Sequence, residues 1–145
     1  MNLHLQTDKD RQTWTDQLKL LHRLYQATIE QIRLADESRH ESGCVLATET
    51  VVGAKAVLRA ERLILEIVAG LDPSFGEVPV QVERLCHFCL QCLEEPDEDR
   101  LRAAEGILTV LAEGFSEIFD EVQTLENTGQ LPPRQMSRSL VDQIV

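Results

Sequence analysis

The amino-acid sequence predicts an all-α fold: an antiparallel up-down-up-down four-helix bundle with a flexible N-terminal arm and a short C-terminal helix. Glycine (7 residues), proline (5 residues) and aromatic residues (4%) are scarce, which favours helices over strands. Apolar residues recur every three or four positions over four long stretches, and this spacing places them on one face of each helix. Only short breaks separate these stretches, and short connections force neighbouring helices to run antiparallel.

The bundle is predicted to cover residues 16–128, after an arm formed by residues 1–15. The arm shows no sustained apolar period. Asp16 or Thr15 is expected to cap the first helix, because either side chain can accept a hydrogen bond from the first free amides. It should end in the polar segment 37–43, where Gly43 marks a turn.

The second helix is predicted to begin at Leu46, to include Thr50, and to end near Gly70. Its apolar stripe widens toward the C-terminal end until it covers well over half of the circumference, more than a surface helix needs for a bundle core. The residues of this wide part are Leu63, Ile64, Leu65, Ile67, Val68 and Leu71.

The third and fourth helices are delimited by turn residues. Residues 72–76 have the composition of a turn. Pro79 suits the first turn of the third helix, where its missing amide would have no partner. Residues 95–97 break that helix, and Asp97 opens the fourth with acidic residues at its positive end. Residues 127–129 end the fourth helix.

Residues 129–145 are predicted to form a tail or a short helix. Their apolar residues follow near-helical spacing, so a helix here would fold back on the bundle or pair with another copy. These residues are Met136, Leu140, Val141, Ile144 and Val145.

The charge balance limits the kind of partner. With 25 acidic and 14 basic residues the net charge is -11, so nucleic acid would be repelled. No apolar run approaches the roughly 20 residues that span a bilayer, so membrane insertion is not expected. The N-terminus lacks the basic and apolar regions of a signal peptide. The sequence therefore predicts a cytosolic protein with reduced cysteines.

Cys86, Cys89 and Cys92 are the most conspicuous candidates for chemistry. On a helix, the sulfurs of Cys86 and Cys92 would lie roughly 9 Å apart along the axis, so one metal ion could not readily bind all three. A core-filling role is favoured, and the alternative of a metal or redox bundle predicts bound zinc or iron. No histidine pair, phosphate loop or nucleophile elbow is present. Neither an enzymatic activity nor a cofactor is predicted.

The surplus of apolar residues permits two interpretations. All of them could be buried in a thick core. Alternatively, some could form a groove that accepts an amphipathic segment of a partner. The acidic surface would then keep the protein from aggregating.

Four segments of the chain together resemble one known family. They are Leu24-Tyr25 with Ile29 and the IRLA at 32–35, RAERLILEIVAGLD (59–72), LCHFCLQCLEE (85–95) and AEGILTVLAEGFSEI (104–118). In this order they resemble the four helices of the flagellar secretion chaperones of the FliS type. The second segment has Glu61 in place of the family's glutamine, and the third lies where the family has an aromatic-rich helix.

The resemblance implies a bacterial cytosolic chaperone that binds the C-terminal segment of flagellin, prevents premature polymerisation and delivers flagellin to the flagellar export apparatus. Components of the export gate are further partners that it implies. The residues expected to form core and groove together are Leu21, Leu24, Tyr25, Ile29, Ala54, Val57, Leu58, Ile64, Leu65 and Val68. The alternative is a non-enzymatic homodimeric bundle that pairs through its C-terminal segment.

Overall fold

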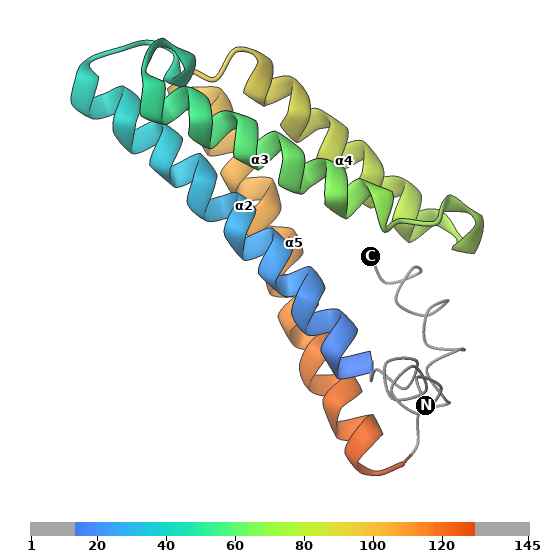
Figure 1. The fold of residues 1–145 in the computed structure, drawn as a ribbon. Coiled ribbons are helices and arrows are strands. Elements are labelled where there is room, and N and C mark those ends of the chain that lie inside the picture. The colour runs from blue at the N-terminus through green and yellow to red at the C-terminus, as the bar shows by residue number, and fades with distance from the viewer. Residues whose placement is uncertain (1–13, 130–145) are drawn as a thin grey trace, which may run out of the picture.

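The computed structural model describes residues 14–129, and this part of the chain is all-helical. The long helices are α2 (Trp14–Ser42), α3 (Val51–Ala69), α4 (Glu77–Glu94) and α5 (Glu98–Asn127), and single 3-10 turns η1 (Ala47–Glu49) and η2 (Pro73–Phe75) precede α3 and α4. Successive helices reverse direction (Figure 1), so the predicted antiparallel four-helix bundle is confirmed. Residues 1–13 of the predicted arm and residues 130–145 of the predicted tail lie outside the described part of the chain.

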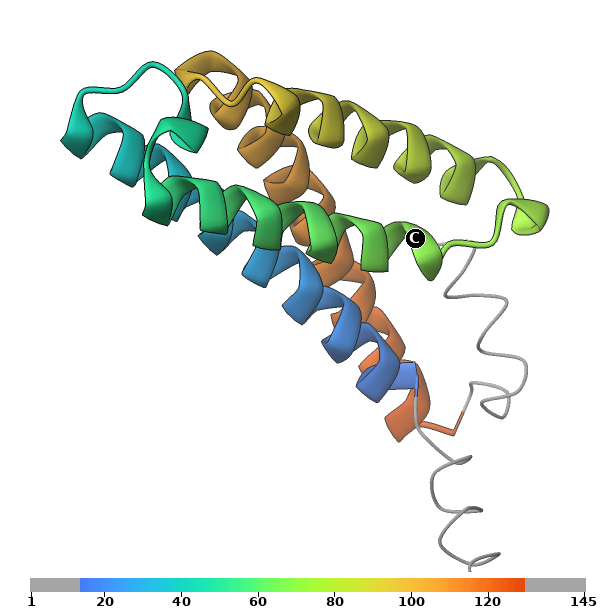
Figure 2. The same ribbon diagram turned by 45° about the horizontal axis from the view of Figure 1, so that its top comes forward.

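The four helices are not equally supported by their neighbours. Helix α2 packs extensively against both α3 and α5, whereas α4 packs mainly against α5 and less against α3. In Figures 1 and 2 the N-terminal part of α2 and the C-terminal part of α5 continue side by side beyond the α3–α4 pair. Within residues 14–129, the bundle therefore has four helices at one end and two at the other.

The ends of α2 follow local chemistry. The predicted cap at Asp16 or Thr15 is wrong, because the helix already includes Trp14 and both residues lie inside it. Asp16 instead lies in the first turn, where its charge complements the positive end of the helix. The predicted turn at Gly43 is confirmed: its φ is 67°, and the amides of Gly43 and Cys44 donate to the carbonyls of His40 and Arg39 in a Schellman motif.

Helix α3 begins later than the apolar spacing predicts. Leu46 and Thr50 were expected inside the helix, but Thr50 is its N-cap, and its side chain accepts a hydrogen bond from the amide of Gly53 at 2.9 Å. Threonine is a favoured N-cap residue because its hydroxyl accepts a hydrogen bond from an amide that has no partner within the helix. The preceding turn is fixed by the Ala47 amide, which donates to the Pro96 carbonyl at 2.9 Å.

The connections before and after α4 lie at the turn residues predicted from the sequence. The Asp72 carboxylate accepts from the Ser74 amide at 3.0 Å, and Gly76 has a φ of 121°, in the region that favours glycine. Pro79 lies buried in the first turn of α4, as predicted. Asp97 accepts from the Arg100 amide at 2.9 Å and opens α5.

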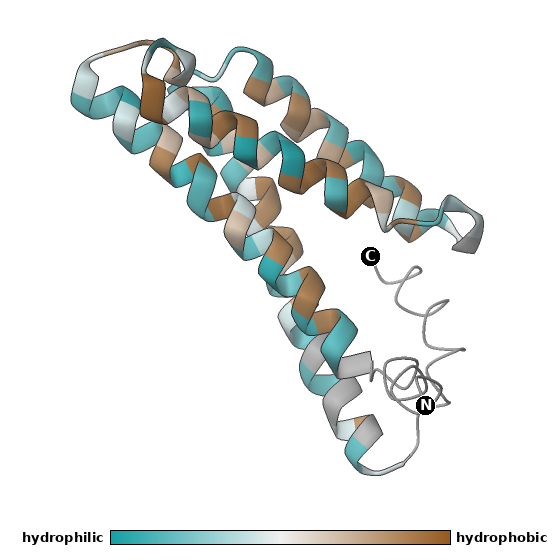
Figure 3. Ribbon diagram, in the orientation of Figure 1, coloured by the Kyte–Doolittle hydropathy of each residue, from teal (hydrophilic) through white to brown (hydrophobic). Residues whose placement is uncertain are grey.

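The hydrophobic core receives side chains from all four helices. Tyr25 of α2 and Phe115 of α5 meet in it with their ring centroids 5.2 Å apart. Apolar and polar residues alternate along every helix (Figure 3), as in helices that each bury one face. Within residues 14–129, no helix combines the length and the hydrophobicity that crossing a membrane would require.

Candidate protein-binding surfaces

The ten residues predicted to form core and groove fall into three groups by burial. Four are buried: Tyr25, Ile29, Val57 and Ile64. Four are partly buried: Leu21, Leu24, Ala54 and Val68. Leu58 and Leu65 are exposed, at 48% and 53%. The structure thus separates the core members of the predicted set from a pair that can contact a partner.

Leu58 and Leu65 lie on the same side of α3, because seven residues make two helical turns. Glu61 lies between them at helical spacing. Burial, and then the carboxylate of Glu94 on α4, raise the pKa of Glu61. We call this row the α3 strip and define it as Ala54, Leu58, Glu61, Leu65 and Val68.

A second apolar surface lies between α4 and α5, and it was not predicted from the sequence. We call it the α4–α5 groove and define it as Val78, Val82, Leu85, Val110, Leu111 and Phe115. Val82 and Phe115 are buried at its floor, whereas Val78, Leu85 and Val110 are exposed. Phe88, one turn beyond Leu85 on α4, is also exposed. The groove therefore continues as an apolar edge along α4.

A signal for this groove is present in the sequence as doubled apolar positions. Leu85 precedes Cys86, and Phe88 precedes Cys89. In each pair the smaller thiol points into the core and is fully buried, while the larger hydrophobic side chain is left exposed. Hydropathy alone would place the leucine or phenylalanine in the core and the cysteine outside. The exposure of Leu85 and Phe88 was therefore not predicted.

Tyr25 packs from inside the core against Phe115, at the floor of the α4–α5 groove. Its side chain is fully buried, and the described residues offer its hydroxyl no hydrogen-bond partner. Burial, together with Cys86 and Cys89, raises the pKa of Tyr25 well above its usual value, so the phenol stays neutral. Thr28, one turn later, satisfies its own hydroxyl by donating to the Leu24 carbonyl at 2.6 Å. This part of α2 is therefore core rather than a site of proton transfer.

The three cysteines of α4 lie in the core. Burial raises the pKa of Cys86 to about 11 and that of Cys89 to about 12, and it also raises the pKa of Cys92. The Cys89 thiol donates to the Ala104 carbonyl of α5 at 3.9 Å. In the part of the chain from 14 to 129, no three His, Cys, Asp or Glu residues are grouped to hold a metal ion. The thiols pack α4 against its neighbours.

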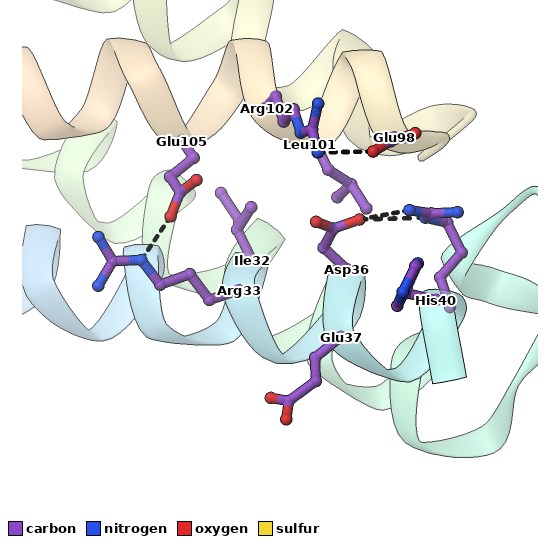
Figure 4. A pocket seen from close by; sticks show the side chains of 10 residues that line it. Ile32, Arg33, Asp36, Glu37, His40, Glu98, Leu101, Arg102 and Glu105 are labelled. Atoms are coloured by element: carbon purple, nitrogen blue, oxygen red, sulfur yellow. Dashed lines mark hydrogen bonds and ion pairs between the residues drawn. The ribbon is translucent and has the colours of Figure 1, made fainter. Parts of the chain in front are cut away.

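A charged pocket of about 310 Å³ lies between α2 and α5, over Ile32 and Leu101 (Figure 4). Its charged groups pair with one another. Arg33 binds Glu105 across the two helices, Arg39 binds Asp36 at 2.8 Å, and Arg102 binds Glu98 at 2.6 Å; Glu37 points away from these pairs. The Arg33–Glu105 and Arg102–Glu98 pairs are largely exposed to solvent and contribute little stability. Each of the three arginines that line the pocket is bound to an acidic partner, so they do not form a group of unpaired cations that would bind an anion.

Comparison with known proteins gives no match to a family model, a curated protein or a solved structure. The function must therefore be inferred from the chain itself. Its described part offers two uncovered apolar surfaces on an acidic bundle, the α3 strip and the α4–α5 groove. Surfaces between or along helices bind amphipathic segments of partner proteins.

Proposed function

We propose that this protein is a cytosolic export chaperone that binds the C-terminal segment of flagellin, keeps it from polymerising early and aids its passage through the flagellar export apparatus. The proposal combines the resemblance of four helical segments to the flagellar secretion chaperones with one structural observation. That observation is the exposure of Leu58 and Leu65, two residues of the predicted contact set, in a row along α3.

The energetics of the α3 strip suit a client that is unfolded before it binds. Burying a leucine contributes roughly 1.5–3 kcal/mol, so two leucines with their partly buried neighbours offer a useful gain. Ordering a client segment costs a few kcal/mol, which this burial offsets. Because Thr50 caps α3 and the face that adjoins the strip is packed in the core, the strip lies on an ordered helix and needs no ordering of its own.

Titration of the purified full-length protein with a peptide from the C-terminus of the host's flagellin tests the proposal. We expect saturable binding with a gain of helicity, measured by calorimetry and circular dichroism. Leu65→Asp should abolish it, since the client would have to bury an unpaired charge. Leu20→Asp is the matched control, because Leu20 has similar exposure, 57%, and lies on α2 outside the strip. It should bind normally.

Two results would contradict the proposal. No binding at tens of micromolar peptide would remove flagellin as the client. Normal binding by a folded Leu65→Asp variant would place the contact elsewhere. Exposed leucines on α3 would also suit a second copy of the chain, the homodimer alternative. Sedimentation distinguishes the two, because a stable dimer unchanged by added flagellin peptide would favour self-association.

A further inference from the structure

The α4–α5 groove is an apolar surface without an occupant among residues 14–129. Val110 is 67% exposed at its edge, next to the exposed Val78 and Leu85 and above the buried Phe115. Its volume is about 250 Å³, below the roughly 300–1,000 Å³ typical of small-molecule pockets. An elongated apolar surface of this size is better suited to a row of side chains from a helix.

We propose that this groove binds the chain's own segment 134–145 as a short amphipathic helix. If the segment is helical, its five apolar residues gather on one half of the surface, together with Ser137 and Arg134, and the other polar residues lie on the opposite half. The apolar residues are Met136, Leu140, Val141, Ile144 and Val145. Pro133 precedes the segment and suits a first helical position.

The lengths of the groove and the segment match. From Val78 to Phe88, the edge contributed by α4 is about 15 Å long at 1.5 Å per residue. Residues 134–145 would form a helix about 18 Å long by the same rise. The segment can therefore place its apolar residues along the whole groove and leave little apolar surface uncovered.

The segment can reach the groove within the same molecule. Asn127 ends α5, and Gly114, beside the groove, lies about 20 Å back along the helix axis. Residues 128–135 can span up to about 26 Å when extended. A segment that turns back in this way runs antiparallel to α5 and parallel to α4, so Met136 lies nearest Val78.

Charge complementarity favours this occupant. Val110, Gly114, Glu117 and Glu121 follow one another at spacings of three and four on α5, so the two glutamates extend the groove edge toward the C-terminal end of the helix. No lysine or arginine occurs in residues 103–129. The returning segment carries Arg134 in its first turn, Arg138 at the border of its apolar half and one acidic residue, Asp142, so its first turn would bring a positive charge to this acidic edge.

Hydrogen exchange of the full-length protein, read by mass spectrometry, tests the proposal without any client. We expect the amides of residues 137–145 to exchange about tenfold or more slowly than in an unstructured chain. Val110→Asp should remove this protection, because the docked helix would bury its carboxylate. Leu140→Asp, which changes only the segment, should do the same, whereas Leu20→Asp should leave the protection intact.

Each alternative occupant gives a different result. Fast exchange of the segment in the unaltered protein would refute docking. Protection that survives Val110→Asp in a folded variant would refute the assignment to the groove. Protection that disappears on dilution, with a dimer in sedimentation, would show that the segment docks on a second copy instead. Concentration-independent protection in a monomer supports docking within one molecule, whether or not flagellin is the client.

Discussion

Gly53 is the residue at which one added methyl group would most disturb the start of α3. A Cβ there would lie far inside contact distance of the Ala47 carbonyl oxygen and against the Thr50 hydroxyl that caps the helix. The Ala47 backbone cannot easily move away, since its amide is bonded to Pro96. The absence of a side chain at Gly53 is thus required by the cap.

Gly53→Ala should lower the free energy of unfolding by about 1–3 kcal/mol, the usual cost of overpacking, even though alanine is the better helix former. Gly106→Ala on α5 is the matched control, because a Cβ there meets no atom within 4 Å. It should raise stability by up to about 1 kcal/mol. Urea unfolding measures both, and equal effects of the two substitutions would show that the cap tolerates a side chain at Gly53.

At the scale of the single helix, α4 is distinguished by three buried thiols in successive turns. The thiolate is the reactive form of cysteine, and both burial and a raised pKa suppress it. Cys44, in the connection after α2, is only partly buried. The four cysteines should therefore divide into one accessible and three inert thiols.

Reaction with a coloured disulfide reagent at pH 8 should label one thiol per chain rapidly. The other three should react only as fast as the protein opens, because Cys86, Cys89 and Cys92 must leave the core first. Cys44→Ser should eliminate the fast phase, and denaturant should make all thiols fast. Two or more rapid thiols in the native protein would show that α4 does not hold its cysteines in the core.

Most helix ends could be predicted because they depend on local chemistry. Gly43, Pro79 and Asp97 each act through their own backbone or side chain, whatever the rest of the molecule does. The start of α3 was missed because Thr50 fits the apolar spacing of the helix equally well as a stripe position and as a cap. The bond that fixes the preceding turn comes from Pro96, distant in sequence.

The candidate surfaces were less predictable than the helices. Spacing identifies the apolar side of α3, but it does not decide that Ile64 is buried and Leu65 exposed, because that depends on which part of this side the neighbouring helices cover. The same applies on α4, where small thiols beside Leu85 and Phe88 fill the core. Adjacent apolar residues compete for one inward direction, and the packing of the neighbouring helices selects between them.

At the scale of the whole molecule, the buried neutral thiols and phenol should make the folded state less stable at alkaline pH. The pKa values of Cys86, Cys89 and Cys92 are raised in the folded state, as is that of Tyr25. The folded protein therefore binds these protons more tightly than the unfolded chain, whose thiols have a pKa of about 8.5. The stabilisation that follows from these raised pKa values is complete below the pKa of the unfolded thiols. It is lost as the pH rises toward the pKa values of the folded state.

The melting temperature should therefore fall as the pH is raised from 8 to 10.5, with each buried thiol costing up to about 1.4 kcal/mol per pH unit above its unfolded pKa. Differential scanning calorimetry measures the dependence. A Cys86→Ala, Cys89→Ala double variant should melt lower at pH 8, because it leaves cavities, yet lose less on going to pH 10.5. A melting temperature that does not change over this interval would show that the buried thiols do not control stability at alkaline pH.

The hydrogen bond from the Ala47 amide to the Pro96 carbonyl joins the α2–α3 connection to the α4–α5 connection. The opposite end of the bundle, where α2 and α5 continue alone, has no such link among the described residues. Thermal fluctuations should consequently be graded along the molecule, smallest beside η1 and largest toward Asn127. The α2–α5 end can then open and close while the other end holds the four helices in register, so local opening at one end does not require the whole bundle to unfold.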